Sequence, residues 1–392
     1  MSKITKNTSV TLNGSTSFKL GTDTYTWDDR FIFVIDAWVP NTDPVRSVTF
    51  TLSGKSWGAS FLNFGGNTKT VITDATTGAD DDTRVYIDFI ALSNAGPNTV
   101  TLKNVEVRTI SGYASADTVS IGYYANSIML GRGDDKLTMT GNGEIGYADM
   151  GRGNDTLTTG NGYLFSAAMG RGNDTVNVGT GDFGLIDLGR DADIVKFSAN
   201  SGTGKIYAGE GISDDLAGAR DFDTADFSAF TKALNIDLEA GTASTDSAFF
   251  EIRAFEKAIG GRGNDTIHGS DSADVLDGGA GLDKLYGHLG ADIFLFEKGD
   301  TGSTRTTADT IYDFTSADSI NLTRWDANSG KSGTQDFAFI GTKAFSGAAG
   351  ELRYTKDTSD TWIEGDTNGD SKADFIIRLD DALKLTASNF DL

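Results

Sequence analysis

Apolar and polar residues alternate in four similar stretches between residues 130 and 196, and a glycine-rich turn opens each stretch. The stretches read LGRGDDKLT, MGRGNDTLT, MGRGNDTVN and LGRDADIVK. One apolar residue follows each turn at the same place, namely Leu137, Leu157, Val176 and Val195. Because residues two apart on a strand face the same side, the alternation predicts short strands that point one apolar side chain inward.

The interval between these stretches predicts a solenoid. The aspartates that close the turns are Asp135, Asp155, Asp174 and Asp193, at spacings of 20, 19 and 19 residues, and a weaker copy places Asp117 another 18 residues upstream. An interval of about 19 residues corresponds to one coil per repeat. Two interior columns are expected, one of Leu130, Met150, Met169 and Leu188 and one of Ile128, Ala148, Ala167 and Ile186.

A second block of repeats follows with a shorter interval. It reads GGRGNDTIH, GSDSADVLD, GGAGLDKLY and GHLGADIFL, and its aspartates Asp265, Asp274, Asp283 and Asp292 are 9 residues apart. Two such units per coil place Asp265 over Asp283 on one edge and Asp274 over Asp292 on the other. In the first block the second half of each coil has no turn aspartate, so only one edge is expected to bind metal there. Ser270 and Ser272 replace glycines, so the edge at Asp274 is expected to bind more weakly.

The chemistry of the turns predicts calcium sites. Glycine allows turn conformations that are closed to residues with a Cβ, and the aspartates add charged oxygens. Successive coils stack at about 4.8 Å, so equivalent carboxylates repel one another unless a cation lies between them. A hard cation with carbonyl and carboxylate ligands is calcium. The predicted ligands are Gly131, Gly133, Asp135, Gly151, Gly153, Asp155, Gly170, Gly172, Asp174, Asp193, Gly261, Gly263, Asp265, Asp274, Gly279, Gly281, Asp283 and Asp292.

The repeats resemble the nonapeptide GGxGxDxUx of the RTX family, whose turns bind calcium between coils. Residues 293–392 are also similar to the C-terminal domain shared by serralysin-type and other RTX proteins, through segments such as ADIFLF, GDTNGDSKADFIIRL and LTASNFDL. With the preceding repeats, the resemblance covers about 221–392. It implies export to the cell exterior by the type I secretion machinery, with the C-terminus as the signal.

One further calcium candidate lies within the tail. Asp366, Asn368, Asp370 and Asp374 have the spacing D-x-N-x-D-x-x-x-D, which is the oxygen spacing of a calcium loop. Ser371 stands where such loops usually have glycine. The alternative interpretation is a solvated acidic hairpin.

Composition agrees with an acidic all-β protein. The chain has 392 residues with 33 basic and 56 acidic side chains, a net charge of −23, 49 glycines, 3 prolines and no cysteine. This charge argues against a nucleic-acid partner, and no apolar run is long enough to span a membrane. The fold class predicted is all-β, a calcium-binding parallel β-roll or β-solenoid with an N-terminal β-sandwich-like domain. The expected divisions are 1–110, solenoid block 111–200, an irregular insert 201–258, the second block 259–300, and a C-terminal domain 301–392.

Catalysis is not expected. There is no HExxH motif and no cysteine, and the only histidines are His268 and His288 in the second block. Gly54 to Gly58 spell GxSxG, but a nucleophilic serine at Ser56 needs a following helix and a histidine within reach. The function expected is a secreted structural or adhesive protein, such as a surface layer, matrix component or adhesin. The alternatives are a calcium-dependent carbohydrate-binding protein and a secreted hydrolase.

Arginine recurs in the third position of the turns, at Arg132, Arg152, Arg171, Arg190 and Arg262. Guanidinium groups stacked coil upon coil repel one another and need a counter-charge. Pairing with turn carboxylates such as Asp134 is one interpretation. The other is a dock for an anionic polymer such as an acidic polysaccharide, since guanidinium groups bind phosphate and carboxylate in a bidentate manner. In the N-terminal region, Trp27, Trp38 and Trp57 are candidates for sugar stacking or for core packing.

Overall fold

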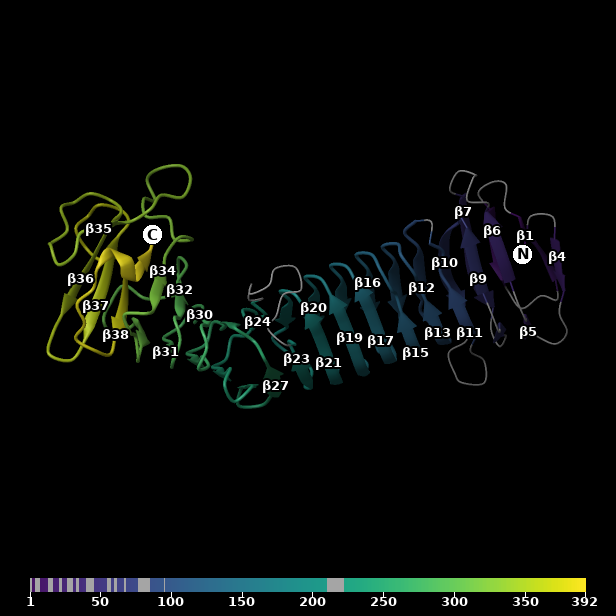
Figure 1. Ribbon diagram of the computed structural model, residues 1–392, viewed down its shortest axis with the longest axis horizontal. Helices are drawn as coiled ribbons and strands as arrows, with labels where there is room; N and C mark the ends of the chain where they lie inside the picture. The colour runs from purple at the N-terminus through teal and green to yellow at the C-terminus, as the bar shows by residue number, and fades with distance from the viewer. Residues whose placement is uncertain are drawn as a thin grey trace. The chain divides into compact units, whose positions relative to one another are not determined.

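The computed structural model describes residues 85–94, 96–209 and 222–392 in full; before residue 85 it describes the strands alone, with side chains over 48–52 and 69–76. Two compact units divide the chain. The first contains Met1–Val195 and Ser201–Asp221, and the second contains Lys196–Asn200 and Phe222–Leu392. Both are built from strands (Figure 1), and the one helix of the described residues is the 3₁₀ turn η1 (Ala387–Asn389).

The first unit is a parallel solenoid with two sheets whose strands are stacked side by side (Figure 1). One sheet contains β1 (Ser2–Lys3), β5 (Phe31–Ile32), β6 (Ile35–Val39), β8 (Gly58–Ala59), β9 (Leu62–Gly66), β11 (Val85–Ala91), β13 (Val105–Ser111), β15 (Tyr124–Met129), β17 (Glu144–Arg152), β19 (Leu164–Arg171), β21 (Phe183–Arg190) and β23 (Lys205–Tyr207). The other contains β2 (Thr8–Leu12), β7 (Arg46–Gly54), β10 (Thr68–Thr76), β12 (Thr99–Leu102), β14 (Thr118–Ile121), β16 (Lys136–Met139), β18 (Thr156–Thr158), β20 (Thr175–Val178) and β22 (Ile194–Phe197). A separate antiparallel pair is formed by β3 (Ser17–Leu20) and β4 (Asp23–Thr26).

The predicted interior columns are confirmed. Ile128, Ala148, Ala167 and Ile186 are register partners along β15, β17, β19 and β21, and all four are buried. The column of Leu130, Met150, Met169 and Leu188 is fully buried, as is the column of Leu137, Leu157, Val176 and Val195 on the other sheet. These three apolar columns lie in the space between the two sheets, and burial of their surface contributes about 25 cal/mol per Å² to folding.

The described N-terminal strands continue the solenoid in parallel. β7 pairs in parallel with β2 and β10, and β10 pairs in parallel with β12. On the other sheet, β11 pairs in parallel with β13, which ends at Ser111. Residues 1–110 were expected to form a β-sandwich-like module, whose strands pair antiparallel, and the parallel pairing corrects that topology. The alternation of apolar and polar residues is the same for half-buried strands of either direction, so it does not reveal the direction of pairing.

Several residues singled out in the sequence lie outside the described residues. These are Trp27, Ser56 and Trp57, and the backbone alone is described for Trp38 in β6. The GxSxG candidate and the sugar-stacking candidates therefore stay predictions.

The second unit combines a shorter solenoid with an antiparallel sheet. One sheet contains β24 (Thr224–Asp226), β28 (Lys257–Ile259), β30 (Val275–Asp277), β32 (Ile293–Leu295), β34 (Ser319–Asn321) and β39 (Phe390–Asp391), all in parallel. Facing strands are β25 (Asn235–Asp237), β26 (Thr242–Ser244), β27 (Phe249–Arg253), β29 (Thr266–His268), β31 (Lys284–Tyr286) and β33 (Asp309–Ile311). The last sheet segment is formed by β35 (Ala338–Phe339), β36 (Glu351–Lys356), β37 (Thr361–Asp366) and β38 (Phe375–Leu379), with β36, β37 and β38 antiparallel.

An aromatic cluster forms the core around the irregular insert 201–258, where the regular repeat interval is lost. Phe197 and Phe227 stack with ring centroids 4.3 Å apart, and Phe230 and Phe250 pack on Phe227 at 5.6 and 5.9 Å. All four side chains are at most 5% exposed. Aromatic rings bury large areas without needing periodic register, so they can form a core where the coils become irregular.

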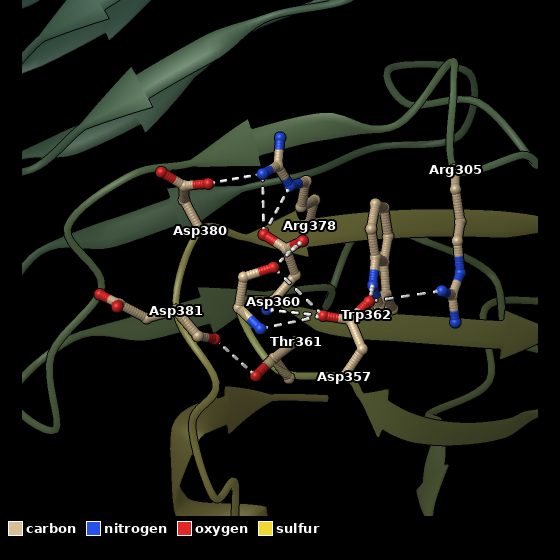
Figure 2. A network of polar contacts seen from close by, with 9 residues as sticks. Arg305, Asp357, Asp360, Thr361, Trp362, Arg378, Asp380 and Asp381 are labelled. Atoms are coloured by element: carbon tan, nitrogen blue, oxygen red, sulfur yellow. Dashed lines mark hydrogen bonds and ion pairs between the residues drawn. The ribbon is translucent and has the colours of Figure 1, made fainter.

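A polar network fixes the end of the β37–β38 hairpin (Figure 2). Arg378 donates to the carboxylates of Asp360 and Asp380, at 2.7 and 2.5 Å. The Trp362 ring lies between two guanidinium groups, with Arg305 at 4.6 Å and Arg378 at 5.7 Å from its centroid. These are cation–π contacts at a partly buried site. They hold the last antiparallel strands against β33, which pairs in parallel with β38.

The stacked turns require glycine at particular positions. Gly153 has φ +135°, and a Cβ built on it would lie 1.9 Å from the carbonyl oxygen of Gly133 in the preceding coil. Gly141 also has positive φ, at +57°, but a Cβ there meets nothing within 4 Å. Gly153 therefore combines a φ outside the left-handed helical region with a collision between coils, whereas Gly141 lies within that region and meets no neighbour.

We expect Gly153→Ala to destabilise the calcium-loaded protein well beyond Gly141→Ala. A strained backbone position costs roughly 1–3 kcal/mol, and Gly153→Ala adds the collision with the neighbouring coil. Urea denaturation of both variants measures the difference. Equal losses in the free energy of unfolding would show that the coils are not in close contact at these turns.

Candidate metal sites

One row of aspartates runs along the turn edge of the first unit, and each carboxylate accepts a hydrogen bond from the coil before it. The N–H of Asp135 donates to Oδ1 of Asp155, that of Asp155 to Asp174, and that of Asp174 to Asp193, each at 2.7 Å. The N–H of Asp117 donates to Oδ1 of Asp135 at 2.6 Å. We call this row the first ladder: Asp117, Asp135, Asp155, Asp174 and Asp193.

Asn98 extends the first ladder toward the N-terminus as an uncharged member. Its N–H donates to Oδ1 of Asp117 at 3.0 Å, and its own Oδ1 accepts the N–H of Thr70 at 2.9 Å. The amide of Asn98 is 1% exposed, so it fills the same buried position as the aspartates. The row therefore ends in a residue that can accept the hydrogen bond without bringing a negative charge.

The second unit has two ladders, one on each edge. On one edge the N–H of Asp265 donates to Oδ1 of Asp283 at 2.7 Å, and that of Asp283 donates to Asp309 at 2.8 Å. On the other edge, the N–H of Asp274 donates to Asp292 at 2.9 Å, and the N–H of Asp292 donates to Asp318 at 3.0 Å. The stacking predicted for both pairs, 265 with 283 and 274 with 292, is thus present.

Asp309 and Asp318 complete these ladders but do not follow the nine-residue spacing. Each lies 26 residues after its partner in the preceding coil, because loops lengthen the last coil. Their local sequences nonetheless carry the signal: ADTI around Asp309 matches NDTI at Asp265, and SADSI around Asp318 matches SADVL at Asp274. A search for the short motif without a fixed spacing would find both.

The second oxygen of most ladder carboxylates is buried and has no hydrogen-bond partner in the described residues. This holds for Oδ2 of Asp117, Asp135, Asp155, Asp174, Asp283, Asp292 and Asp309. Each of these residues is at most 1% exposed. An ionised carboxylate that is buried without compensation costs several kcal/mol. A cation at these oxygens removes that cost, and the donor set fits calcium, which prefers hard oxygen ligands.

The glycine turns bring carbonyl oxygens to the same edge. In the first unit the predicted glycines all have positive φ: Gly131, Gly133, Gly151, Gly153, Gly170 and Gly172, from +97° to +135°. Gly279 and Gly281 are also positive, whereas Gly261 and Gly263 need glycine because a Cβ would lie 2.5 and 2.4 Å from the preceding coil. Asp191 replaces the glycine of the fourth turn and still adopts φ +76°. The turn shape is thus retained where the glycine is lost.

The Asp274 turn differs, as its sequence indicated. Oδ2 of Asp274 accepts hydrogen bonds from the backbone N–H and the hydroxyl of Ser270, at 2.5 and 2.9 Å. The hydroxyl of Ser270 also accepts the N–H of Ser272 at 3.1 Å. These serines compete with a cation for the carboxylate, so weaker binding at this turn stays the expectation.

The opposite edge of the first block is joined mainly by uncharged groups, and its Asp182, which accepts the N–H and hydroxyl of Thr203, is exposed. The N–H of Gly179 donates to Oγ1 of Thr159 at 2.7 Å, and the hydroxyl of Thr180 donates to Asn161 at 2.7 Å. Among the described residues of that block, the buried carboxylates all belong to the first ladder. This distribution is consistent with metal sites on one edge.

Asp366, Asn368, Asp370 and Asp374 lie together in the loop between β37 and β38. Oδ1 of Asp366 accepts the N–H of Asn368 and Gly369, and Oδ2 accepts the N–H of Ser371. Asp374 accepts the N–H and hydroxyl of Thr367 and the side-chain amide of Asn368. Ser371 has φ +65°, the conformation that glycine usually supplies. These hydrogen bonds define a compact loop, and the calcium loop and the acidic hairpin stay alternative predictions for it.

Burial shifts the acidity of the ladder carboxyls. Desolvation raises the pKa of Asp135 to about 7, of Asp174 to about 8 and of Asp283 to about 9, and nearby carboxylates add to the rise. Hydrogen bonds from the backbone lower these pKa values only in part. The ladders are therefore electrostatically unfavourable at neutral pH without a counter-charge.

No group of three histidine, aspartate or glutamate side chains is close enough to hold a metal by side chains alone in the described part of the chain. The candidate sites thus depend on backbone carbonyls together with single ladder aspartates from successive coils. In the same residues, no helix has the length and apolar character needed to cross a bilayer.

The fold and the ladders define a class: a parallel β-solenoid whose glycine turns stack carboxylates along its edges. Residues 214–390 match the family described as Peptidase M10 serralysin C terminal. This part of the chain, which is somewhat less than half of it, is an RTX serralysin-type C-terminal domain. RTX repeat regions of this type generally bind calcium. The first ladder lies outside the matched residues, and no curated protein matches the chain.

The raised pKa values predict how stability without calcium depends on pH. The ordinary carboxyl pKa is 3.8, and that of Asp283 in the folded chain is about 9. Between these values the folded state binds more protons than the unfolded state, so its free energy of unfolding falls as pH rises. We expect the protein in chelator to be more stable near pH 5 than near pH 8. Circular dichroism measures this: in chelator the β signal should be larger near pH 5 than near pH 8, and a signal that rises with pH would contradict the prediction.

Proposed function

We propose that this protein is a secreted calcium-binding solenoid that acts as a structural or adhesive component outside the cell. The observation that carries this proposal is the set of buried ladder carboxylates, named above, whose second oxygens have no hydrogen-bond partner among the described residues. Such a chain folds where calcium is abundant, and extracellular calcium modules bind at about 10⁻⁴ to 10⁻³ M. Because proteins with RTX repeats are typically secreted, the family match supports the same location.

The ladder aspartates and the glycine carbonyls of the turns would hold the calcium ions. Calcium there would supply the counter-charge for the buried carboxylates and link successive coils. When a site does not exist in the unfolded chain, the free energy of metal binding becomes free energy of folding. The ladders would therefore make the stacking of the coils conditional on calcium.

Export through a type I system, which is part of this proposal, would require the C-terminal segment to be accessible. Leu385 and Phe390 are at most 7% exposed, and β39 pairs with β34 through Phe390 and Asp391. This segment is thus part of the folded sheet, where secretion machinery has little access to it. Low calcium inside the cell would leave the repeats unfolded and the segment accessible. We assign the protein no catalytic role, because the matched region is the C-terminal part of the serralysin family.

Asp155→Asn should raise the calcium concentration needed for folding several-fold. Asparagine keeps an oxygen that can accept the N–H of Asp135 but removes the charge from the buried edge. Circular dichroism during calcium titration at pH 8 measures the midpoint. We expect the wild-type repeats to be largely unfolded in chelator and rich in β structure at millimolar calcium.

Asp187→Asn is the matched control for this variant. It removes one negative charge from an exposed position on β21, away from the ladders. Its calcium midpoint should equal that of the wild type. An equal shift in both variants would attribute the effect to net charge, and an unchanged β signal in chelator would contradict calcium-dependent folding.

The structural role predicts calcium-dependent assembly of the whole chain. Electron microscopy of the purified protein should show ordered sheets or filaments at millimolar calcium and dispersed particles in chelator. Dispersed monomers in both conditions would contradict a layer-forming role and would favour the alternative of a binding protein.

A specific observation supports that alternative. Arg152 is a register partner of Arg132 on one side and of Arg171 on the other, and Arg171 is a partner of Arg190. All four side chains are exposed on one edge, and Arg132 and Arg152 line a surface pocket of about 460 Å³ that also contains Asp149. An acidic polysaccharide with regularly spaced charges fits such a row. Replacing Arg152 and Arg171 with glutamine should then abolish polysaccharide binding without changing the calcium midpoint, whereas a weakened calcium midpoint alone would indicate local pairing.

A further inference from the structure

The only two histidines of the chain are in contact with each other. Nδ1 of His268 lies 3.1 Å from Nε2 of His288, and the two rings are nearly parallel, at 20°. His268 is the last residue of β29, and His288 lies in the turn that follows β31. The pair is thus formed between two coils, twenty positions apart in the chain.

His288 occupies a position where the repeat has glycine. In the nonapeptide directly before, which lies on the opposite edge, Gly279 holds this place with φ +72°, and His288 adopts φ +65°. A residue with a Cβ in the left-handed region costs roughly 1 kcal/mol or more. The chain therefore accepts backbone strain at the one turn where an imidazole can meet the other histidine. Strain retained in this way indicates a use for the side chain.

The surroundings hold both imidazoles in place. The His268 ring stacks on Tyr286 at 4.3 Å and 7°, and Tyr286 stacks on Tyr312 at 4.6 Å and 8°. The backbone N–H groups of Gly287 and His288 donate to the two carboxylate oxygens of Asp313, at 2.8 and 2.9 Å. One histidine is thus fixed by ring stacking and the other by the hydrogen bonds of its turn. Neither arrangement uses the imidazole nitrogens that face each other.

The spacing of the two nitrogens suits a shared metal ion. Zinc binds histidine nitrogen at about 2.0–2.1 Å, so two nitrogens in a tetrahedral site are about 3.3 Å apart. Imidazole is a ligand that zinc and copper prefer, whereas calcium takes oxygen. Burial and the neighbouring His288 lower the pKa of His268, which favours the neutral form that binds metal. His288 is exposed, so the site is open to solvent.

We propose that His268 and His288 form a two-histidine site for a divalent transition metal such as zinc, separate from the calcium ladders. Water, or a donor from another molecule, completes the coordination, because no third side-chain ligand joins the pair in the described residues. The site spans the two successive coils that carry Asp265 and Asp283, so it forms only when these coils are stacked.

Isothermal titration of the full chain with zinc chloride, in calcium sufficient to saturate the ladders, tests the proposal. We expect about one zinc per chain bound at this site, and a loss of at least about tenfold in affinity for His268→Asn and for His288→Gly. His288→Gly restores the residue of the repeat and relieves the positive φ, so its thermal stability in calcium should equal or exceed that of the wild type. Loss of zinc binding in this variant therefore does not come from unfolding.

Leu289→Ala is the matched control, since Leu289 is 65% exposed in the same turn and has no metal-binding group. It should bind zinc as the wild type does. Zinc affinity that is the same in His288→Gly and in the wild type would overturn the proposal, because the metal would then be held at the aspartates. Absence of zinc binding by the calcium-loaded wild type would overturn it as well.

Discussion

The structure depends on one repeated interaction: a carboxylate that accepts the backbone N–H of the preceding coil through one oxygen and leaves its other oxygen buried. The hydrogen bond sets the register, since it joins equivalent residues such as Asp135 and Asp155 at 2.7 Å. The buried charge makes the same contact unfavourable without a counter-ion. The same aspartate side chain therefore both sets the register of the coils and destabilises their stacking when no cation is bound. The apolar columns between the sheets supply stabilisation that does not depend on metal. Whether this stabilisation is enough to fold the chain depends on whether the ladder carboxylates have a counter-ion.

The repeated part of the fold could be predicted from the sequence because its signals are local and periodic. The glycine turns, the inward apolar residues and the spacing of Asp135, Asp155, Asp174 and Asp193 together define the coil, its interior and its edge. Where the period changes, prediction fails in identifiable ways. Asp309 and Asp318 join the ladders across loops that the spacing does not anticipate, and the parallel direction of β7, β10 and β11 is not encoded in their alternation.

Contacts between residues far apart in the sequence were also beyond local patterns. The pairing of His268 with His288 depends on the register of β29 with β31 and on the positive φ of His288. The spacing of Asp366, Asn368, Asp370 and Asp374 predicts a calcium loop or an acidic hairpin, but it does not show which backbone N–H groups donate to these carboxylates. In both cases the interpretation depends on which atom each polar group contacts, and these contacts are visible only in the three-dimensional structure.

The ladders also have a direction. Within each ladder, the N–H of one aspartate is satisfied by the carboxylate of the coil that follows it in the sequence, as for Asp155 and Asp174. The N–H of each ladder aspartate is thus satisfied by the coil that follows, whereas the N–H of the next residue donates to the coil before, as from Thr156 to the carbonyl of Asp135. Removing a ladder carboxylate leaves an unsatisfied N–H donor in the coil upstream. If the chain orders from its C-terminal coils, each coil that is added finds the carboxylate that accepts its N–H already in place. The stack would then grow from the C-terminal end toward the N-terminal end.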